Sequence, residues 1–179
     1  MPTLLQLKIG ALVTLIVAWA FTVAALFTPA WRNLDSDNSV GLVTYHCSST
    51  ACNSFKNNVP DWSSTCKDLN IAAAVGMTIK LIVSLVTWNK TKSKCMSVLK
   101  VLVCLIAIAK LLVLLILYAI KSDDYFGSGG AFQYSTVATA TATSHSGTSL
   151  GYSYWFALVA AVFMVFSTGF SIVEPCIAK

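Results

Sequence analysis

The chain has 179 residues and a formal net charge of +5, yet only 11% of its residues are charged and 56% are hydrophobic. Soluble domains are usually about one quarter charged. This composition excludes an ordinary soluble domain and favours a membrane protein. The basic residues lie between apolar runs, so the positive charge does not indicate nucleic-acid binding.

Four apolar runs are long enough to cross a bilayer, which takes about 20 residues of helix. They occupy about 9–29, 71–88, 99–120 and 153–173. The uncharged run Ile9–Phe27 is longer than the apolar core of a usual signal peptide, so we predict that it is retained as a span. The sequence therefore predicts a single domain over 1–179, an all-α membrane bundle of four transmembrane helices.

The lysines predict the orientation of this bundle. The connection 89–98 between the second and third runs holds Lys90, Lys92 and Lys94 and no acid. Such basic connections stay in the cytosol, so we expect 32–70 and 121–152 to be extracellular loops and both termini to be cytosolic. The predicted location is the plasma membrane. Asn89 begins the sequence Asn-Lys-Thr, a glycosylation signal that this orientation leaves unused.

The two predicted outer loops differ in character. Residues 39–47 are rich in strand-forming side chains, which predicts a small extracellular antiparallel sheet on top of the bundle. The second loop contains alternating Thr and Ala over about 135–144. This pattern fits either one strand that joins the same sheet or a flexible, O-glycosylated stretch, and both interpretations remain open.

The cysteines divide between the two sides of the membrane. Cys47, Cys52 and Cys66 lie in the predicted outer loop, where disulfides persist, and allow one disulfide and one free thiol. We favour Cys47–Cys66, which would join the middle of the loop to its return, over Cys47–Cys52, which would close only a small ring. Cys95 and Cys176, on the predicted cytosolic side, are candidates for palmitoylation.

Two lysines interrupt the apolar runs. Lys80 and Lys110 fall near the middle of the second and third runs, where a charge is costly and by default marks a functional site. No apolar run contains an acid that would pair with them. Four interpretations remain open: they line a polar cavity, they bind an anionic lipid headgroup, they extend their long stems to the membrane surface, or one of them is neutral.

No motif indicates catalysis. Residues 147–151 match the G-x-S-x-G pattern of hydrolases, with His145 nearby, but they precede a membrane span and leave no room for the required α/β sheet. His46 and His145 lack companion ligands for a metal. We expect no enzyme, no catalytic residue, no metal site and no cofactor.

Two stretches carry a family resemblance. The first run ends in FTPAWRN, then SVGLVTYHC follows, and the fourth run begins with GYSYWF. The first two resemble the claudin signature, and the third is similar to the start of span four in the epithelial membrane and peripheral myelin proteins. Val43 departs from the signature because a tryptophan is expected there, and the interval from Gly41 to Cys47 is one residue longer than usual. The matching positions are Trp31, Arg32, Gly41, Leu42, Cys47, Gly151, Tyr152, Ser153 and Tyr154.

The resemblance implies a function at cell–cell contacts. Claudin-like proteins carry an outer sheet held by the first-loop tryptophan, here Trp31, and associate with copies of themselves within one membrane and between cells. The alternative within the superfamily is an auxiliary subunit that regulates gating or trafficking of an ion channel or receptor. Charged loop residues would line the gap between cells. Their signs nearly cancel here, which predicts adhesion or a barrier without strong charge selectivity. The candidates are Asp35, Asp37, Lys56, Asp61, Lys67 and Asp68.

Overall fold

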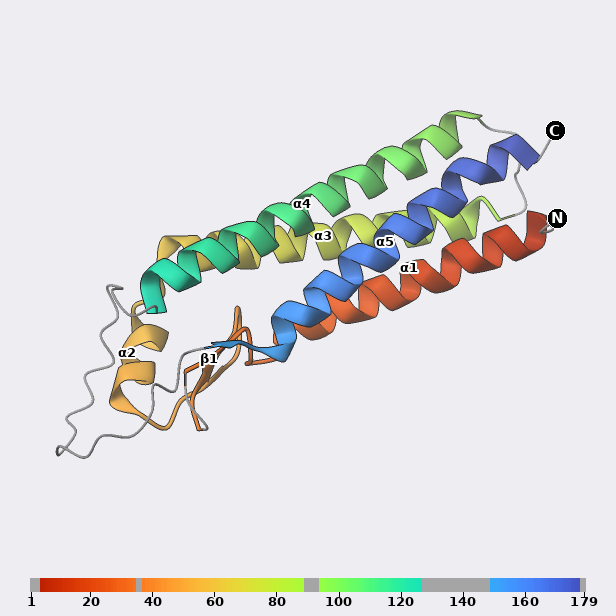
Figure 1. Ribbon diagram of the computed structural model, residues 1–179. Helices are drawn as coiled ribbons and strands as arrows, with labels where there is room; N and C mark the ends of the chain where they lie inside the picture. The colour runs from red at the N-terminus through yellow and green to blue at the C-terminus, as the bar shows by residue number, and fades with distance from the viewer. Residues whose placement is uncertain (1–3, 35–36, 89–93, 127–148, 178–179) are drawn as a thin grey trace.

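The computed structural model describes residues 4–34, 37–88, 94–126 and 149–177. Within these ranges, four helices contain stretches long and apolar enough to cross a membrane. They run side by side as an elongated bundle, and the described chain begins and ends at the same end of it (Figure 1). The predicted four-helix bundle is thereby confirmed. The helices are α1 (Leu4–Phe27), α3 (Asp61–Val86), α4 (Lys94–Phe126) and α5 (Tyr152–Ile177).

The outer surface of the bundle is apolar. Large side chains such as Val86, Val98 and Ile116 are 69%, 67% and 59% exposed. A soluble protein rarely exposes such a continuous apolar surface. Here that surface faces hydrocarbon, so the bilayer takes the place of water as the solvent of the bundle.

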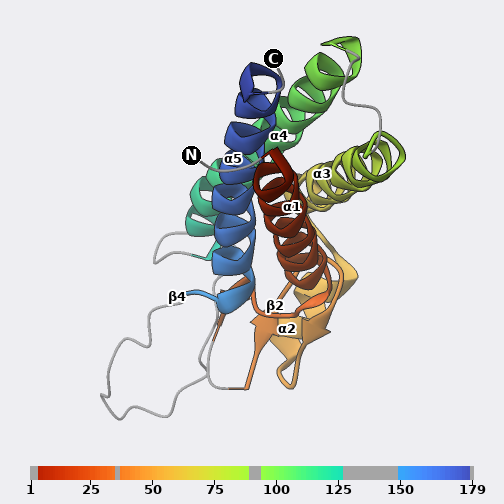
Figure 2. The same ribbon diagram turned by 90° about the vertical axis from the view of Figure 1, so that its right-hand side faces the viewer.

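Small side chains let the helices approach one another closely. Ala18 and Ala25 of α1 and Ala157 and Ala160 of α5 are fully buried. Accordingly α1 packs most extensively against α5, and α3 against α4 (Figure 1 and Figure 2). Close packing of small residues is what associates helices in lipid, where burial of apolar surface gives no net gain.

Two helices extend beyond the predicted spans. The sequence predicts a span that begins near residue 71, but α3 begins at Asp61. Pro60 precedes the helix in an extended conformation (φ −63°, ψ 149°), and the Asp61 carboxylate stabilises the positive end of the helix. Cys66 and Asn70 of this extension are fully buried. Residues 61–70, within the predicted outer loop 32–70, are therefore helical, and their place relative to the membrane stays a prediction. Helix α4 likewise continues to Phe126.

A four-stranded antiparallel sheet lies at the end of the bundle opposite the chain ends (Figure 1). Its order is β3-β2-β1-β4, and Arg32 pairs with Val40 on one side and Leu150 on the other. Strand β4 comes from the second predicted loop, so both loops contribute to one sheet. The Thr/Ala stretch and His145 lie in 127–148, outside the described residues. The strands are β1 (Arg32–Asn33), β2 (Ser39–Val40), β3 (Tyr45–His46) and β4 (Ser149–Leu150).

A short helix completes this end of the molecule. Helix α2 (Thr50–Asn57) is capped by Ser49, whose Oγ accepts a hydrogen bond from the Cys52 backbone N–H at 3.2 Å. We call the described residues of 28–60 and 149–151 the cap. The cap has its own apolar cluster, which consists of Leu34, Val40, Cys52, Phe55 and Phe126. Because Phe126 belongs to α4, this cluster also attaches the cap to the bundle.

Candidate functional site: the junction of cap and bundle

Trp31 is the residue on which the cap rests. Its side chain is fully buried, and its indole Nε1 donates a hydrogen bond to the carbonyl oxygen of Ala25 at 2.6 Å. That carbonyl belongs to the last turn of α1, where intrahelical donors are missing. The Trp31 ring packs against Tyr118 of α4 and Tyr154 of α5, with centroid distances of 4.8 and 6.2 Å.

The backbone N–H and carbonyl of Trp31 also form hydrogen bonds, each to a different segment of the chain. Its N–H donates to the Val40 carbonyl at 3.0 Å, and its own carbonyl accepts from the Gly151 N–H at 2.9 Å. One residue therefore joins α1, β2, α4 and the start of α5. This arrangement agrees with the holding role that the family resemblance implies for Trp31.

Two glycines of the signature are required by close backbone approach. A Cβ at Gly151 would lie 2.1 Å from the carbonyl oxygen of Ala30, and a Cβ at Gly41 would lie 2.6 Å from the carbonyl oxygens of Thr28 and Thr44. Real Cβ atoms do not approach backbone this closely, so larger residues would push the strands off the helices. These two signature glycines therefore occupy positions where two backbone segments are in close contact.

The other signature residues lie at the start of α5, directly after Gly151. Ser153 donates its backbone N–H to the Ala30 carbonyl at 3.0 Å, and its hydroxyl lies 2.6 Å from that of Thr28. Tyr154 packs on Trp31, whereas Tyr152 is 48% exposed and faces outward. Stretches far apart in sequence thus meet at one junction.

Arg32 attaches the sheet to α4. Its guanidinium is buried and donates hydrogen bonds to the hydroxyl of Ser122 and the carboxylate of Asp123. A buried cation is tolerated only with such partners. Asp123 itself is largely exposed, with 74% of its side chain accessible. Sequence reasoning identified Arg32 but not its partners at the end of α4.

A chain of aromatic rings continues from this junction into the cap. Trp62 packs against Tyr118 and Tyr125, and Tyr125 packs against Phe55, with centroid distances of 5.7 to 6.0 Å. Phe55 in turn contacts Tyr45 of β3. Burial raises the pKa of Tyr45, so its hydroxyl stays neutral in the physiological range. The sequence analysis did not identify this cluster, although the spacing of Tyr118 and Tyr125, two helical turns apart, is a signal that could have indicated it.

The disulfide differs from the favoured prediction. Cys47 bonds to Cys52, with a Cα–Cα distance of 5.3 Å, and Cys66 is a buried free thiol. The preference for Cys47–Cys66 was wrong because residue 66 lies inside α3 and belongs to the bundle core. The bond that forms instead fastens α2 to the end of β3.

Leu42 and Val43 follow Gly41 in the turn between β2 and β3. Leu42 is buried in the core of the bundle, 2% exposed, whereas Val43 points outward and is 39% exposed. The position at which the claudin signature has its second tryptophan is therefore a surface position of the cap in this chain.

The candidate gap-lining charges do not form one group on a loop. Asp37 and Lys56 are exposed on the cap, at the β1–β2 connection and on α2. Asp61, Lys67 and Asp68 instead lie on the first turns of α3. Asp35 lies outside the described residues.

The two lysines in the spans have different surroundings. Lys80 is 2% exposed, and its Nζ donates to the Ser167 hydroxyl of α5 at 2.8 Å. Ser167 passes the bond on to the Ala11 carbonyl at 3.1 Å, so Lys80 links α3 through α5 to α1. Lys110 is half-buried on α4.

Two further candidates fall at the edge of the described structure. Cys95 and Cys176 lie in the first turn of α4 and the last turn of α5, and their side chains are outside the described part. Their palmitoylation stays a prediction.

These features define a class of protein: a four-span membrane bundle that carries a disulfide-bonded, sheet-containing cap fixed to it through a buried tryptophan. The family model described as "Tight junction protein, Claudin-like" matches residues 1–174, and the chain belongs to this family. Comparison with curated protein sequences and with solved structures gave no match. The protein is thus a multi-pass membrane protein of claudin-like type.

Proposed function

We propose that this protein acts at contacts between cells, where it associates with copies of itself and holds membranes together or seals the gap. In this proposal the cap is extracellular, and the lysine-rich connection 89–98 and both termini are cytosolic. The protein acts as a structural component and not as an enzyme. The observation that carries the proposal is the attachment of the cap to the bundle through Trp31, in a chain of this family.

A fixed cap suits a contact between membranes. Trp31 contacts α1, α4 and α5, and Arg32 bonds to α4, so the cap cannot turn freely on the bundle. A preorganised surface loses little conformational freedom when it meets a partner, and the energy of contact is available for association. Forces on the cap are also passed directly to helices held in the bilayer.

The surface of the cap offers apolar contacts beside charged ones. Val43 and Val59 are 39% and 38% exposed and project away from the bundle core. Asp37 and Lys56 are exposed on the same part of the chain. Because these two charges have opposite sign, we propose adhesion or a barrier and not strong selection among ions.

Localisation in mixed cells tests the proposal. A tagged chain would be expressed in cells that lack it, and these cells would be cultured together with untransfected ones. We expect the protein to concentrate at borders between two expressing cells and not at borders with untransfected cells. The variant Val43→Glu should lose this enrichment because it places a charge in the contact. Val43→Thr, which keeps the shape and adds no charge, is the matched control.

The channel-subunit function gives a different result in the same experiment. A uniform membrane signal, or retention inside the cell until another membrane protein is supplied, would contradict self-association between cells. Co-purification with a channel or receptor would then support the auxiliary-subunit alternative.

A further inference from the structure

Lys110 lies at the middle of the apolar part of α4. With a rise of about 1.5 Å per residue, it stands about 15 Å from either end of the run 99–120. The four-carbon stem of a lysine is much shorter than this distance, so its ammonium group does not reach the lipid headgroups of either leaflet. A positive charge held at this depth is costly and by default marks a functional site.

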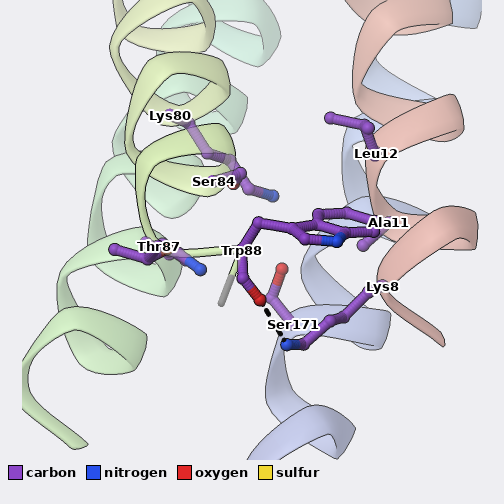
Figure 3. Close-up of a pocket in the computed structure, with 9 residues that line it drawn as sticks. Lys8, Ala11, Leu12, Lys80, Ser84, Thr87, Trp88 and Ser171 are labelled. Atoms are coloured by element: carbon purple, nitrogen blue, oxygen red, sulfur yellow. Dashed lines mark hydrogen bonds between the residues drawn. The ribbon is translucent and has the colours of Figure 1, made fainter. Parts of the chain in front are cut away.

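The ammonium group of Lys110 has no polar partner among the described residues. No hydrogen bond or ion pair within 4–34, 37–88, 94–126 and 149–177 involves it. Two lysines elsewhere in the bundle have such contacts. The Lys8 Nζ donates to the Trp88 carbonyl at 2.9 Å (Figure 3), and the Lys80 Nζ donates to the Ser167 hydroxyl at 2.8 Å. Lys110 therefore lacks the compensation that these two lysines have.

No carboxylate of this chain lies at the depth of Lys110. All seven aspartates and glutamates of the sequence lie outside the apolar runs 9–29, 71–88, 99–120 and 153–173. A second copy of the chain in the same membrane would bring another lysine to this depth and no acid. Intramembrane charges are compensated by groups of opposite charge, so the partner that satisfies Lys110 is a different protein.

Lys110 stands in a row of side chains that is partly open to the lipid. The intervals within this row alternate between three and four residues, which places its members along one side of the helix. Ile106 and Val113, one turn to each side of Lys110, are 50% and 53% exposed, whereas Ala107 and Leu111 face the core and are 2% and 0% exposed. We call this row the lysine seam; it consists of Val103, Ile106, Lys110, Val113 and Leu117.

We propose that the lysine seam binds, within the same membrane, a transmembrane helix of a different protein that carries an aspartate or glutamate at mid-depth. The carboxylate accepts a charge-assisted hydrogen bond from the Lys110 ammonium group, and each charge compensates the other where water is absent. The apolar side chains above and below Lys110 pack against the partner helix, as in a coiled coil in which one polar position specifies the partner. The proposal concerns association within one membrane and does not depend on function at cell contacts.

The test measures binding of a model helix to the full chain in phosphatidylcholine vesicles. The probe is a dye-labelled polyleucine transmembrane peptide with one aspartate at its centre. Two control peptides carry leucine in place of this aspartate, or carry the aspartate two turns nearer one end. Binding to the dye-labelled protein is followed by fluorescence energy transfer as the ratio of peptide to lipid increases. Lys110→Leu removes the charge from the lysine seam, and Lys110→Arg keeps it.

We expect the wild type to bind the peptide with the central aspartate about tenfold more tightly than either control peptide, because a polar pairing between two helices in lipid contributes about this factor. Lys110→Leu should lose this preference, and Lys110→Arg should keep it. Equal binding of the three peptides by the wild type would overturn the proposal, and this comparison stands even if Lys110→Leu fails to fold. A preference that Lys110→Leu retains would place the carboxylate elsewhere and would also overturn it.

A second pair of variants tests whether the lysine seam is the contact face. Val113 and Leu112 are 53% and 46% exposed, but as neighbours in sequence they point to different sides of α4. Val113→Trp adds bulk beside Lys110 and should lose the preference for the aspartate peptide, whereas Leu112→Trp should keep it. Equal binding by these two variants would overturn the assignment to this face. Energy transfer between differently labelled copies of the wild type that Lys110→Leu abolishes would assign the lysine seam to self-association and overturn the choice of partner.

Discussion

Replacement of Trp31 by alanine should detach the cap from the bundle. Truncation of a buried tryptophan costs about 3–5 kcal/mol through lost contacts and the remaining cavity. Loss of the hydrogen bond to Ala25 leaves a buried carbonyl without this donor, which adds about 1 kcal/mol. We therefore expect Trp31→Ala to lower the free energy of unfolding by about 4–6 kcal/mol. Trp31→Phe keeps most of the apolar contact and should cost about 1–3 kcal/mol.

The assay is unfolding in mixed micelles with increasing dodecyl sulfate, followed by far-ultraviolet circular dichroism. Trp155→Ala serves as the control, because Trp155 is 53% exposed on the outer face of α5, and it should cost less than about 1 kcal/mol. The expected order of destabilisation is Trp31→Ala, then Trp31→Phe, then Trp155→Ala. If Trp31→Ala were no more destabilising than Trp155→Ala, the holding role of Trp31 would be refuted.

Three further outcomes follow from the structure. Gly151→Ala should destabilise the protein by about 1–3 kcal/mol, measured by thermal unfolding in detergent, because the new methyl group meets the Ala30 carbonyl; wild-type stability would contradict this contact. Cys52→Ser should cost about 2 kcal/mol and release the Cys47 thiol for alkylation, whereas Cys66→Ser should leave the disulfide intact in a non-reducing mass measurement; loss of the disulfide in Cys66→Ser would show that the pairing is different. Peptide N-glycosidase treatment should not change the mass of the chain from mammalian cells, because the proposed orientation places Asn89 in the cytosol; a sugar at Asn89 would contradict the proposed orientation.

The spans could be predicted from the sequence because lipid imposes a simple requirement. A helix in hydrocarbon satisfies its own backbone groups and shows apolar side chains on all sides, so composition alone reveals it. The outer turns of α3 escaped this criterion. Residues 61–70 contain Asp61, Lys67 and Asp68 and resemble a loop, but their buried side chains follow a helical spacing toward the core. The incorrect disulfide prediction had the same cause, because it treated Cys66 as a loop residue.

The junction was predictable only in part. Trp31, Arg32 and Gly151 stand in short motifs that resemble a family signature, so the sequence could identify them. Their partners Tyr118 and Asp123 lie near the end of α4, in an ordinary apolar run and the polar residues after it. Contact between these partners and the motif residues depends on how far α4 continues beyond residue 120. Packing of α4 against the cap determines where the helix ends.

Docking of vesicles that contain only this protein and lipid tests the central claim most directly. Purified protein would be reconstituted into two sets of phosphatidylcholine vesicles with different dyes, and their association would be measured by fluorescence correlation. Function at cell contacts predicts association only when both sets contain the protein, and its loss with Val43→Glu but not with Val43→Thr. Equal association with protein-free vesicles, or none at all with the cap exposed on both sets, would contradict self-association across membranes.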